Sequence, residues 1–227
     1  MRTLFLIPAR AGSKGIAHKN RKLLAGKPLI GDSIEVAMQL APSEDICIST
    51  DDREIISIAE SYGLSVPFVR PDELAQNNSG SYEVIMHALD YYAARGKVYD
   101  TVVLLQPTSP FRTANHVRQA MELYTSSCDM VVSVTEAKSN PYYVMFKEGE
   151  DGFLHHILEG KFTRRQDAPV IYEYNGAVYV MNVASLREKH VTAFDRNRKY
   201  VMPRSASIDL DTPEDWDYAE YMLAKRL

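Results

Sequence analysis

The sequence predicts an α/β fold built on a doubly wound, mostly parallel sheet. Short apolar runs typical of buried strands alternate along the chain with longer segments whose apolar residues recur at helical spacing. Strands are predicted at Leu4–Ile7 and Ile46–Ile48, followed by a third short strand at Val66–Val69. In such sheets ligands bind at the carboxyl ends of the strands, so the loops that follow the strands are the candidate functional segments.

The first two helices have recognisable ends. Pro28 begins the first helix, in which apolar residues recur every three or four positions as far as Leu40. Asp51 or Asp52 caps the second helix, and Gly63 ends it.

The second half of the sheet begins with Thr101–Leu105, the strongest buried-strand pattern in the chain. It ends in Gln106-Pro107-Thr108-Ser109-Pro110, where two prolines make a stiff turn. Other predicted elements are helices at Val84–Ala94 and Asn115–Tyr124 and a strand at Met130–Val134.

Residues 136–174 have a different pattern and are predicted to form an inserted arm. Tyr142–Phe146 and Phe153–Leu158 are strand-like and are separated by acidic turns. An exposed apolar arm is usually covered by a partner, which favours a homodimer.

Composition predicts a single globular domain over residues 1–227. Of these residues, 45% are hydrophobic and 25% are charged. The first apolar run is too short for a signal peptide, and no run is long enough to span a membrane. Cys47 and Cys128 lie in apolar segments, and we expect buried free thiols and a cytoplasmic location.

The loop after the first strand is the main candidate for ligand binding. It carries Gly12 and Gly15, which permit close backbone approach and positive φ, so that successive N–H groups can turn toward one anion. Residues 1–31 contain seven Lys or Arg and no acidic residue, whereas the rest of the chain has 19 basic residues against 30 acidic ones. This segregation favours a polyphosphate ligand over a solvated basic turn.

Asp209 and Asp211 are the candidate metal ligands. Two carboxylates two positions apart on an extended segment point the same way, and Mg²⁺ with phosphate co-ligands would relieve their repulsion. The alternative is a helix N-terminus, because Thr212-Pro213-Glu214-Asp215 is a typical helix start. The two interpretations are compatible.

Several motifs resemble one known family. The loop Ala9-Arg10-Ala11-Gly12-Ser13-Lys14-Gly15, followed by Lys19-Asn20, resembles the signature of the acylneuraminate cytidylyltransferases, also called CMP-sialic acid synthetases. The resemblance extends through Arg70–Ala75, Gln106–Arg112, Asn175–Tyr179 and Ser207–Thr212, and so over nearly the whole chain. It implies a Rossmann-like sheet of the nucleotide-diphospho-sugar transferase type with a β-rich dimerisation arm.

The resemblance also implies a role for each matching residue. The implied CTP-binding residues are Arg10, Ala11, Gly12, Ser13, Lys14, Lys19, Asn20, Arg70, Ser79 and Ser81. The implied sugar-binding residues are Gln106, Arg165, Asn175 and Tyr179, with Arg165 on the sugar carboxylate. Asp209 and Asp211 would hold Mg²⁺, or Mn²⁺ in its place, and the implied catalytic residues are Arg10, Lys19, Gln106 and Asp211. Thr108, Ser109 and Arg112 are interpreted as mostly structural.

The resemblance implies an enzyme of nucleotide-sugar biosynthesis that activates a nonulosonic (sialic-type) acid with CTP and releases pyrophosphate. Two alternatives stay open. One is the same chemistry on a legionaminate-type or eight-carbon acid, because Pro141-Tyr142-Tyr143 replaces the Pro-Leu-Lys of some sialate-activating relatives. The other is a catalytically silent nucleotide-binding homologue. We expect no nucleic-acid or membrane partner.

Overall fold

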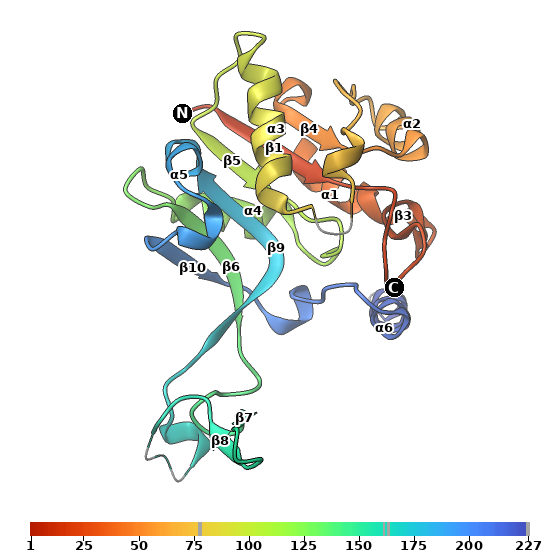
Figure 1. Ribbon diagram of the computed structural model, residues 1–227. Helices are drawn as coiled ribbons and strands as arrows, with labels where there is room; N and C mark the ends of the chain where they lie inside the picture. The colour runs from red at the N-terminus through yellow and green to blue at the C-terminus, as the bar shows by residue number, and fades with distance from the viewer. Residues whose placement is uncertain (77–78, 161, 163, 226–227) are drawn as a thin grey trace.

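The computed structural model describes residues 1–76, 79–160, 162 and 164–225. Within these ranges, a six-stranded sheet has the order β10-β6-β9-β5-β1-β4. The strands are β1 (Thr3–Pro8), β4 (Ile46–Ser49), β5 (Thr101–Leu104), β6 (Met130–Glu136), β9 (Tyr172–Asn182) and β10 (Asn197–Val201). β9 is antiparallel to both its neighbours, and the other pairings are parallel. This confirms the predicted mostly parallel α/β sheet (Figure 1).

Helices cover both faces of the sheet because alternate side chains of each strand point to opposite sides. Phe5 and Ile7 of β1 share a buried cluster with α1, α2 and α4, whereas Leu4 and Leu6 share another with α3 and α5. The helices are α1 (Leu29–Met38), α2 (Arg53–Ser61), α3 (Ser81–Ala93), α4 (Ala114–Glu122), α5 (Val183–Glu188) and α6 (Pro213–Ala224).

Short elements complete the described chain. Two small hairpins pair β2 (Leu23–Leu24) with β3 (Lys27–Pro28) and β7 (Phe146–Glu148) with β8 (Leu154–His156). The 3₁₀ helices are η1 (Lys19–Arg21), η2 (Ser43–Asp45), η3 (Asp72–Leu74), η4 (Arg165–Asp167), η5 (Val191–Ala193) and η6 (Arg204–Ala206). Across the described ranges, no helix has both the length and the apolar character needed to cross a membrane.

Most predicted elements are confirmed, including the caps of two helices. Asp52, one of the two candidates, caps α2 by accepting from the Glu54 N–H. Thr212 caps α6 in a reciprocal capping box with Asp215, and Pro213 occupies its first turn. Cys47 and Cys128 are buried and free, as predicted.

Two predicted strands are wrong. Val66–Val69 is not a strand; Pro67 lies within it and has no N–H to give to a ladder. Tyr142–Phe146 is mostly a turn, because the Asn140 side chain accepts from the Tyr142 N–H and the Asn140 carbonyl accepts from Val144. The strand β7 therefore begins only at Phe146.

The arm projects from the body of the molecule, as predicted, and carries the β7–β8 hairpin at its end (Figure 1). The β6–β9 ladder extends to the Glu136–Tyr172 pair and so forms the stem of the arm. At the hairpin, Phe153 and Leu154 are each 70% exposed, so this surface is apolar and uncovered in the single chain.

A bulge interrupts the β6–β9 ladder where the arm leaves the body. The ladder pairs Val132 with Tyr179 and Val134 with Tyr174. Between these two pairs β9 therefore has more residues than β6. Ser133 holds the extra length in place: its hydroxyl accepts from the Val178 N–H (2.7 Å) and donates to the Asn175 side-chain oxygen (2.6 Å).

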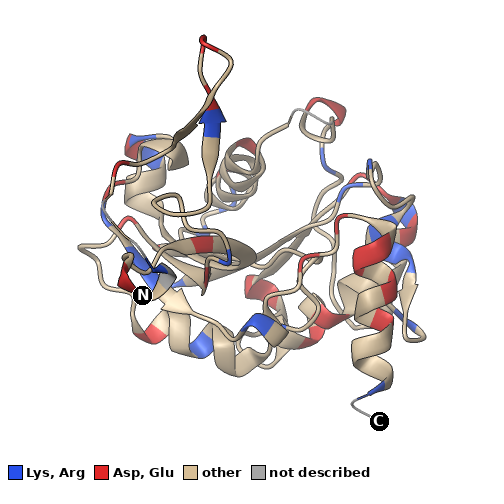
Figure 2. Cartoon of the chain, turned by 90° about the horizontal axis from the view of Figure 1, so that it is seen from below, with Lys and Arg blue, Asp and Glu red and all other residues tan. Residues whose placement is uncertain are grey.

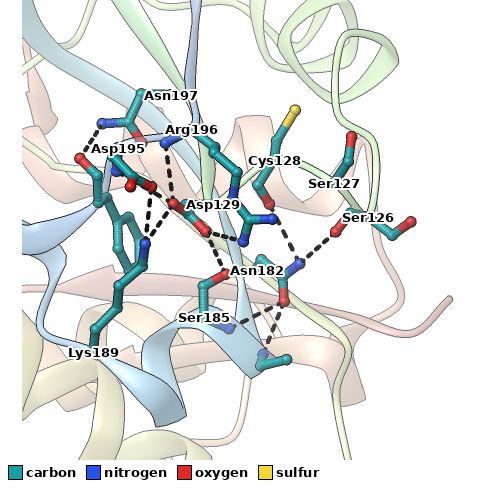
Figure 3. A network of polar contacts seen from close by, with 12 residues as sticks. Ser126, Ser127, Cys128, Asp129, Asn182, Ser185, Lys189, Asp195, Arg196 and Asn197 are labelled. Atoms are coloured by element: carbon teal, nitrogen blue, oxygen red, sulfur yellow. Dashed lines mark hydrogen bonds and ion pairs between the residues drawn. The ribbon is translucent and has the colours of Figure 1, made fainter.

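A buried carboxylate joins β6 to the segment before β10 (Figure 3). Asp129 is fully buried and accepts hydrogen bonds from the Arg196 guanidinium (2.8 Å) and the Ser185 hydroxyl (2.7 Å). Lys189 pairs with its other oxygen at 3.0 Å. The hydrogen bond from Arg196 is the largest cause that holds the pKa of Asp129 well below its ordinary value, against the opposing effect of burial.

We predict that Asp129→Asn lowers the free energy of unfolding by about 2 kcal/mol at pH 7, because charge-assisted hydrogen bonds are lost in a buried place. A depressed folded-state pKa stabilises the fold above the unfolded-state value of about 3.9, and this contribution disappears as the pH falls below it. The difference in melting temperature between wild type and variant should therefore shrink below about pH 4. The control Asp195→Asn removes a 78% exposed carboxylate from the same cluster and should cost less than about 1 kcal/mol. Equal losses in the two variants would contradict this account.

Candidate active site

A cavity of about 300 Å³ lies at the carboxyl ends of β1 and β5 and beside the first turn of α3. Eleven residues that the sequence singled out line it: Arg10, Gly12, Ser13, Lys14, Lys19, Asn20, Arg70, Ser79, Ser81, Gln106 and Asp211. They come from segments far apart in the sequence, and the parallel strands bring them together. The other lining residues were not predicted as ligand contacts: Pro8, Gly15, Gly80, Val84, Pro107 and Thr108.

The phosphate-binding candidate loop needs its second glycine for close packing. A Cβ on Gly15 would stand 1.9 Å from the carbonyl oxygen of Asp211, whereas a Cβ on Gly12 would meet nothing within 4 Å. Neither glycine has a positive φ; His18 is the left-handed residue of this loop, with φ of 51°. Gly15 is therefore needed for close packing against Asp211, and neither glycine uses the positive φ that glycine permits.

Lys19 and Asn20 tie the loop in place. The ammonium of Lys19 donates to the Leu210 carbonyl (2.5 Å) and to a carboxylate oxygen of Asp211 (3.0 Å). Lys19 is only 8% exposed, so its charge requires such partners. The side-chain amide of Asn20 donates to the carbonyl of Arg10 (3.0 Å) and closes the loop on itself.

Arg70 is the buried cation of the cavity wall. Its guanidinium donates to the hydroxyl and the carbonyl of Ser49 at the end of β4, at 3.0 and 2.5 Å. Arg70 is 4% exposed, and burial lowers its pKa to about 10, with Asp51 opposing that shift and Arg10 adding to it. An arginine held so firmly presents fixed donors to a ligand.

Ala11 does not line the cavity. Its N–H donates instead to the carboxylate of Asp51 (2.8 Å). The sequence identified Asp51 only as a possible helix cap. The signal that could have found its role is the pair Asp51-Asp52, because only one of the two can cap α2, and Asp52 does so.

The two candidate metal ligands differ in exposure. Asp211 is exposed and lines the cavity, whereas Asp209 is half-buried. Among the residues that the structure describes, one oxygen of Asp209 is buried without a hydrogen-bond partner. Burial raises the pKa of Asp209, a hydrogen bond from the Thr108 side chain opposes this shift, and the charge of Asp211 adds to it. The Leu210 N–H between them donates to the carbonyl of Thr108 (2.9 Å) and fixes the segment.

These two carboxylates fit a hard divalent cation. Carboxylate oxygens are ligands that Mg²⁺ accepts, and one oxygen of Asp209 makes no hydrogen bond of ordinary geometry within the described chain. No group of three or more His, Cys, Asp or Glu that could hold a metal occurs in the described part of the chain. The protein would therefore supply only one or two ligands, and substrate phosphates and water the others.

The predicted sugar-binding residues lie in different places. Gln106 lines the cavity, and its carbonyl accepts from the buried Arg112. Asn175 is buried, and its amide donates to the Ser207 hydroxyl (2.8 Å). Tyr179 lies on β9, where burial and the charge of Asp209 raise its pKa. The backbone of Arg165 lies on η4 of the arm.

Arg112 is structural, as predicted. It is 3% exposed and donates to the carbonyls of Gln106 (3.0 Å) and Ala177 (2.8 Å). It also donates to the hydroxyl of Ser33 and so connects the turn after β5 to β9 and α1.

The cationic first segment packs against an acidic helix. Trp216 and Ala219 of α6 share a buried cluster with Ile16 and Leu24, and Lys22 lies over the Trp216 ring at 4.2 Å. The helix that leads to the C-terminus in Figure 2 carries the acidic residues Glu214, Asp215, Asp217 and Glu220. Opposite charges from the two ends of the chain thus meet beside the cavity.

Comparisons with known proteins agree with this geometry. A family model described as "Cytidylyltransferase" matches residues 4–227. The CMP-N,N'-diacetyllegionaminic acid synthase of Legionella pneumophila is 34% identical over 98% of this chain and 97% of its own length. The N-acylneuraminate cytidylyltransferase of Escherichia coli is 36% identical over 96% of this chain, which spans 52% of that protein. The pseudaminic acid cytidylyltransferase of Campylobacter jejuni is 30% identical over 98% of this chain and 96% of its own length.

Among solved structures, a CMP:2-keto-3-deoxy-manno-octonic acid synthetase complexed with CTP superimposes with a TM-score of 0.72 over the full length of both chains. Its sequence identity to this chain is 15%, so the likeness is one of fold.

We predict that Gly15→Ala lowers the free energy of unfolding by about 1–3 kcal/mol, because the new methyl group must push the loop away from the Asp211 backbone. For a chain of this size, each kcal/mol lowers the melting temperature by about 2–4 °C. Thermal unfolding followed by circular dichroism measures the effect. Gly12→Ala is the matched control and should melt like the wild type, since open space surrounds that position. If both variants melted at the wild-type temperature, the close packing would be refuted.

Proposed function

This chain belongs to the cytidylyltransferase family, and from that premise we propose that it couples CTP to a nine-carbon 2-keto-3-deoxy sugar acid and releases pyrophosphate. The observation that carries the proposal is the single cavity in which the cationic loop, Arg70 and Asp211 meet. The anomeric hydroxyl of the sugar acid attacks the α-phosphorus, an oxygen–phosphorus bond forms, and pyrophosphate leaves in line.

The cavity residues divide the work of positioning and charge stabilisation. Arg10, Lys14 and Lys19 supply positive charge for the triphosphate, and the backbone of Gly12 and Ser13 supplies N–H groups. Arg70, Ser79 and Ser81, which line the same cavity, supply donors and acceptors for the edge of cytosine. Asn20 holds the loop through the Arg10 carbonyl.

Asp209 and Asp211 are the residues that we propose to hold Mg²⁺, for which Mn²⁺ can substitute. When bound, the ion would neutralise negative charge on the phosphates. Lys19, which already contacts Asp211, then lies where it can bind the same phosphates. Gln106, which lines the cavity, would orient the sugar.

The sugar acid is proposed to be a nonulosonic acid. Relatives named for legionaminic, neuraminic and pseudaminic acids have 30–36% identity, whereas the likeness to the octonic acid synthetase is one of fold. Within this class a sialic-type acid is the first candidate and a legionaminate-type acid the second, because the legionaminic relative matches along 97% of its length. A silent nucleotide binder is disfavoured, since a binder has little need for two carboxylates of which one oxygen is buried and unpaired.

We further propose that the enzyme is a cytoplasmic homodimer in which the arm of one subunit reaches the cavity of the other. The apolar hairpin supports this arrangement, because Phe153 and Leu154 are strongly exposed in the single chain. Arg165 lies on this arm and would hold the sugar carboxylate, and Asn175 and Tyr179 lie on β9, the strand that returns from the arm. Two buried free thiols support the cytoplasmic location.

The proposed function predicts pyrophosphate release from CTP only with a matching sugar acid. The assay offers N-acetylneuraminic, legionaminic, pseudaminic and octulosonic acids, each with CTP or UTP and each with or without chelator. We expect turnover with a nine-carbon acid, a loss of about ten- to a hundredfold with UTP because its ring edge mispairs with the buried donors, and no turnover in chelator until Mg²⁺ or Mn²⁺ is added.

Each condition of this assay can contradict one statement. Equal rates with UTP would refute the cytosine assignment, and full activity in chelator would refute the metal. Binding of CTP without turnover on any acid would leave the silent binder as the better description.

Subunit mixing tests whether Arg165 on the arm of one subunit acts in the site of the other. Arg165→Ala should raise the KM for the sugar acid far more than that for CTP, and Asp211→Asn should lower turnover by at least about a hundredfold. When equal amounts of the two impaired chains exchange subunits, half the dimers are mixed. Each mixed dimer holds one wild-type site and one site with both substitutions. Activity should therefore recover to about a quarter of wild type. If Arg165 acted within its own chain, every site would carry a lesion and the mixture would stay inactive.

A further inference from the structure

Residues at the end of β4 form hydrogen bonds with several segments around the cavity, and the proposed chemistry does not use them. Ser49 and Thr50 are fully buried. The Ser49 carbonyl accepts from the Ala9 N–H (2.9 Å) as well as from Arg70, and the Thr50 carbonyl accepts from the Arg70 N–H (2.7 Å). These bonds connect Ala9, at the start of the cationic loop, to Arg70 of the cavity lining through Ser49 and Thr50.

Asp51, the next residue in the chain, extends these contacts to Ala11 within the loop. It lies 40 residues from Ala11 in sequence, and one of its carboxylate oxygens accepts from the Ala11 N–H at 2.8 Å. The bond falls between Arg10 and Gly12, both of which line the cavity, whereas neither Ala11 nor Asp51 does. Asp51 therefore acts from behind the loop and does not touch the ligand space.

A bond at this point fixes which way the loop faces. If the Ala11 N–H is held toward Asp51, the peptide plane between Arg10 and Ala11 has one orientation, because peptide bonds are planar. The Arg10 carbonyl of that same peptide is held by the Asn20 amide (3.0 Å). Both polar groups of one peptide are thus anchored to side chains on opposite sides of the loop. The following residues, Gly12 to Lys14, continue from it into the cavity wall.

The charge of Asp51 has a second effect at the same place. Arg10 and Arg70 both line the cavity, and each carries positive charge. The charge of Arg10 disfavours protonated Arg70, and that of Asp51 favours it. The carboxylate therefore offsets the repulsion between two cations that face the same ligand space.

We propose that Asp51 is a positioning residue of the phosphate site: its hydrogen bond to the Ala11 N–H holds the loop in the conformation that binds a triphosphate. The ligand class is a chain of phosphates, which rests on the proposed function when the ligand is CTP. Asp51 makes no contact with the ligand and takes no part in the bond changes.

Three substitutions separate the hydrogen bond from the charge. Asp51→Ala removes both, Asp51→Asn keeps a side-chain oxygen as an acceptor and removes the charge, and Asp51→Glu keeps the charge but moves the acceptor by one methylene. Asp52→Ala is the matched control, because the neighbouring Asp52 caps α2 and pairs with Arg21 but does not touch the loop.

Binding is measured by calorimetry on the full chain with three probes: inorganic tripolyphosphate, CTP and cytidine. We expect Asp51→Ala to weaken tripolyphosphate and CTP about tenfold or more, the usual effect of losing a charge-assisted hydrogen bond. Cytidine should bind within about twofold of wild type, because Arg70 and Ser81 are unchanged. Asp51→Asn should bind tripolyphosphate within about threefold of wild type, and Asp51→Glu several-fold more weakly. Asp52→Ala should lower the melting temperature and leave all three affinities unchanged.

Three outcomes would overturn the proposal. They are wild-type tripolyphosphate binding by Asp51→Ala, equal losses in Asp51→Asn and Asp51→Ala, and a parallel loss of cytidine, which would indicate general damage to the fold. If Asp51→Ala does not fold, Asp51→Glu decides, and wild-type binding by that variant would overturn the proposal. If the wild-type chain binds tripolyphosphate but does not prefer CTP to UTP, the cytosine assignment is refuted. The tripolyphosphate affinities of the Asp51 variants still decide the role of Asp51.

Discussion

The contact between Lys19 and the Leu210–Asp211 segment is the interaction on which the site depends. It joins residues 192 positions apart and brings the cationic loop to the carboxylate pair. Each side needs the other: the Lys19 ammonium is almost buried and requires an anion, and the acidic segment gains a positive neighbour. Gly15 makes the contact sterically possible, because any side chain at that position would collide with the Asp211 carbonyl. The acidic helix α6 then packs beside the same basic segment and extends the charge match.

The antiparallel strand β9 gives the molecule its projecting arm. It lies between β5 and β6, which are otherwise arranged as in an ordinary doubly wound sheet. Because β9 runs opposite to its neighbours, the chain must leave the carboxyl end of β6, turn outside the body and return, and the arm is that excursion (Figure 1). The same topology places the arm at the edge of the sheet where the cavity lies.

Much of this arrangement could be predicted from sequence, and the failures have two causes. Apolar periodicity located the main strands and helices because burial on one or both faces leaves a strong pattern. Glycine, charge and carboxylate motifs located most of the cavity lining because the carboxyl ends of parallel strands converge. The wrong strands at Val66–Val69 and Tyr142–Phe146 are places where Pro67 and Asn140 decide the backbone locally, whatever the hydropathy. Asp51 and Asp129 were missed as hubs because their partners are backbone groups and distant side chains, which leave no local pattern.

The bulge at Ser133 and Asn175 has a consequence for how the arm meets another surface. A plain two-stranded stem would flex, and much of its freedom would be lost on association, at a cost in entropy. Here the stem leaves the sheet through a kink whose extra backbone is pinned by the Ser133 hydroxyl and by the Asn175 amide, which also grips Ser207. The angle of the arm is thereby set before any encounter. In the proposed dimer, the apolar hairpin is a preorganised surface, and less of the binding free energy is spent on ordering the stem.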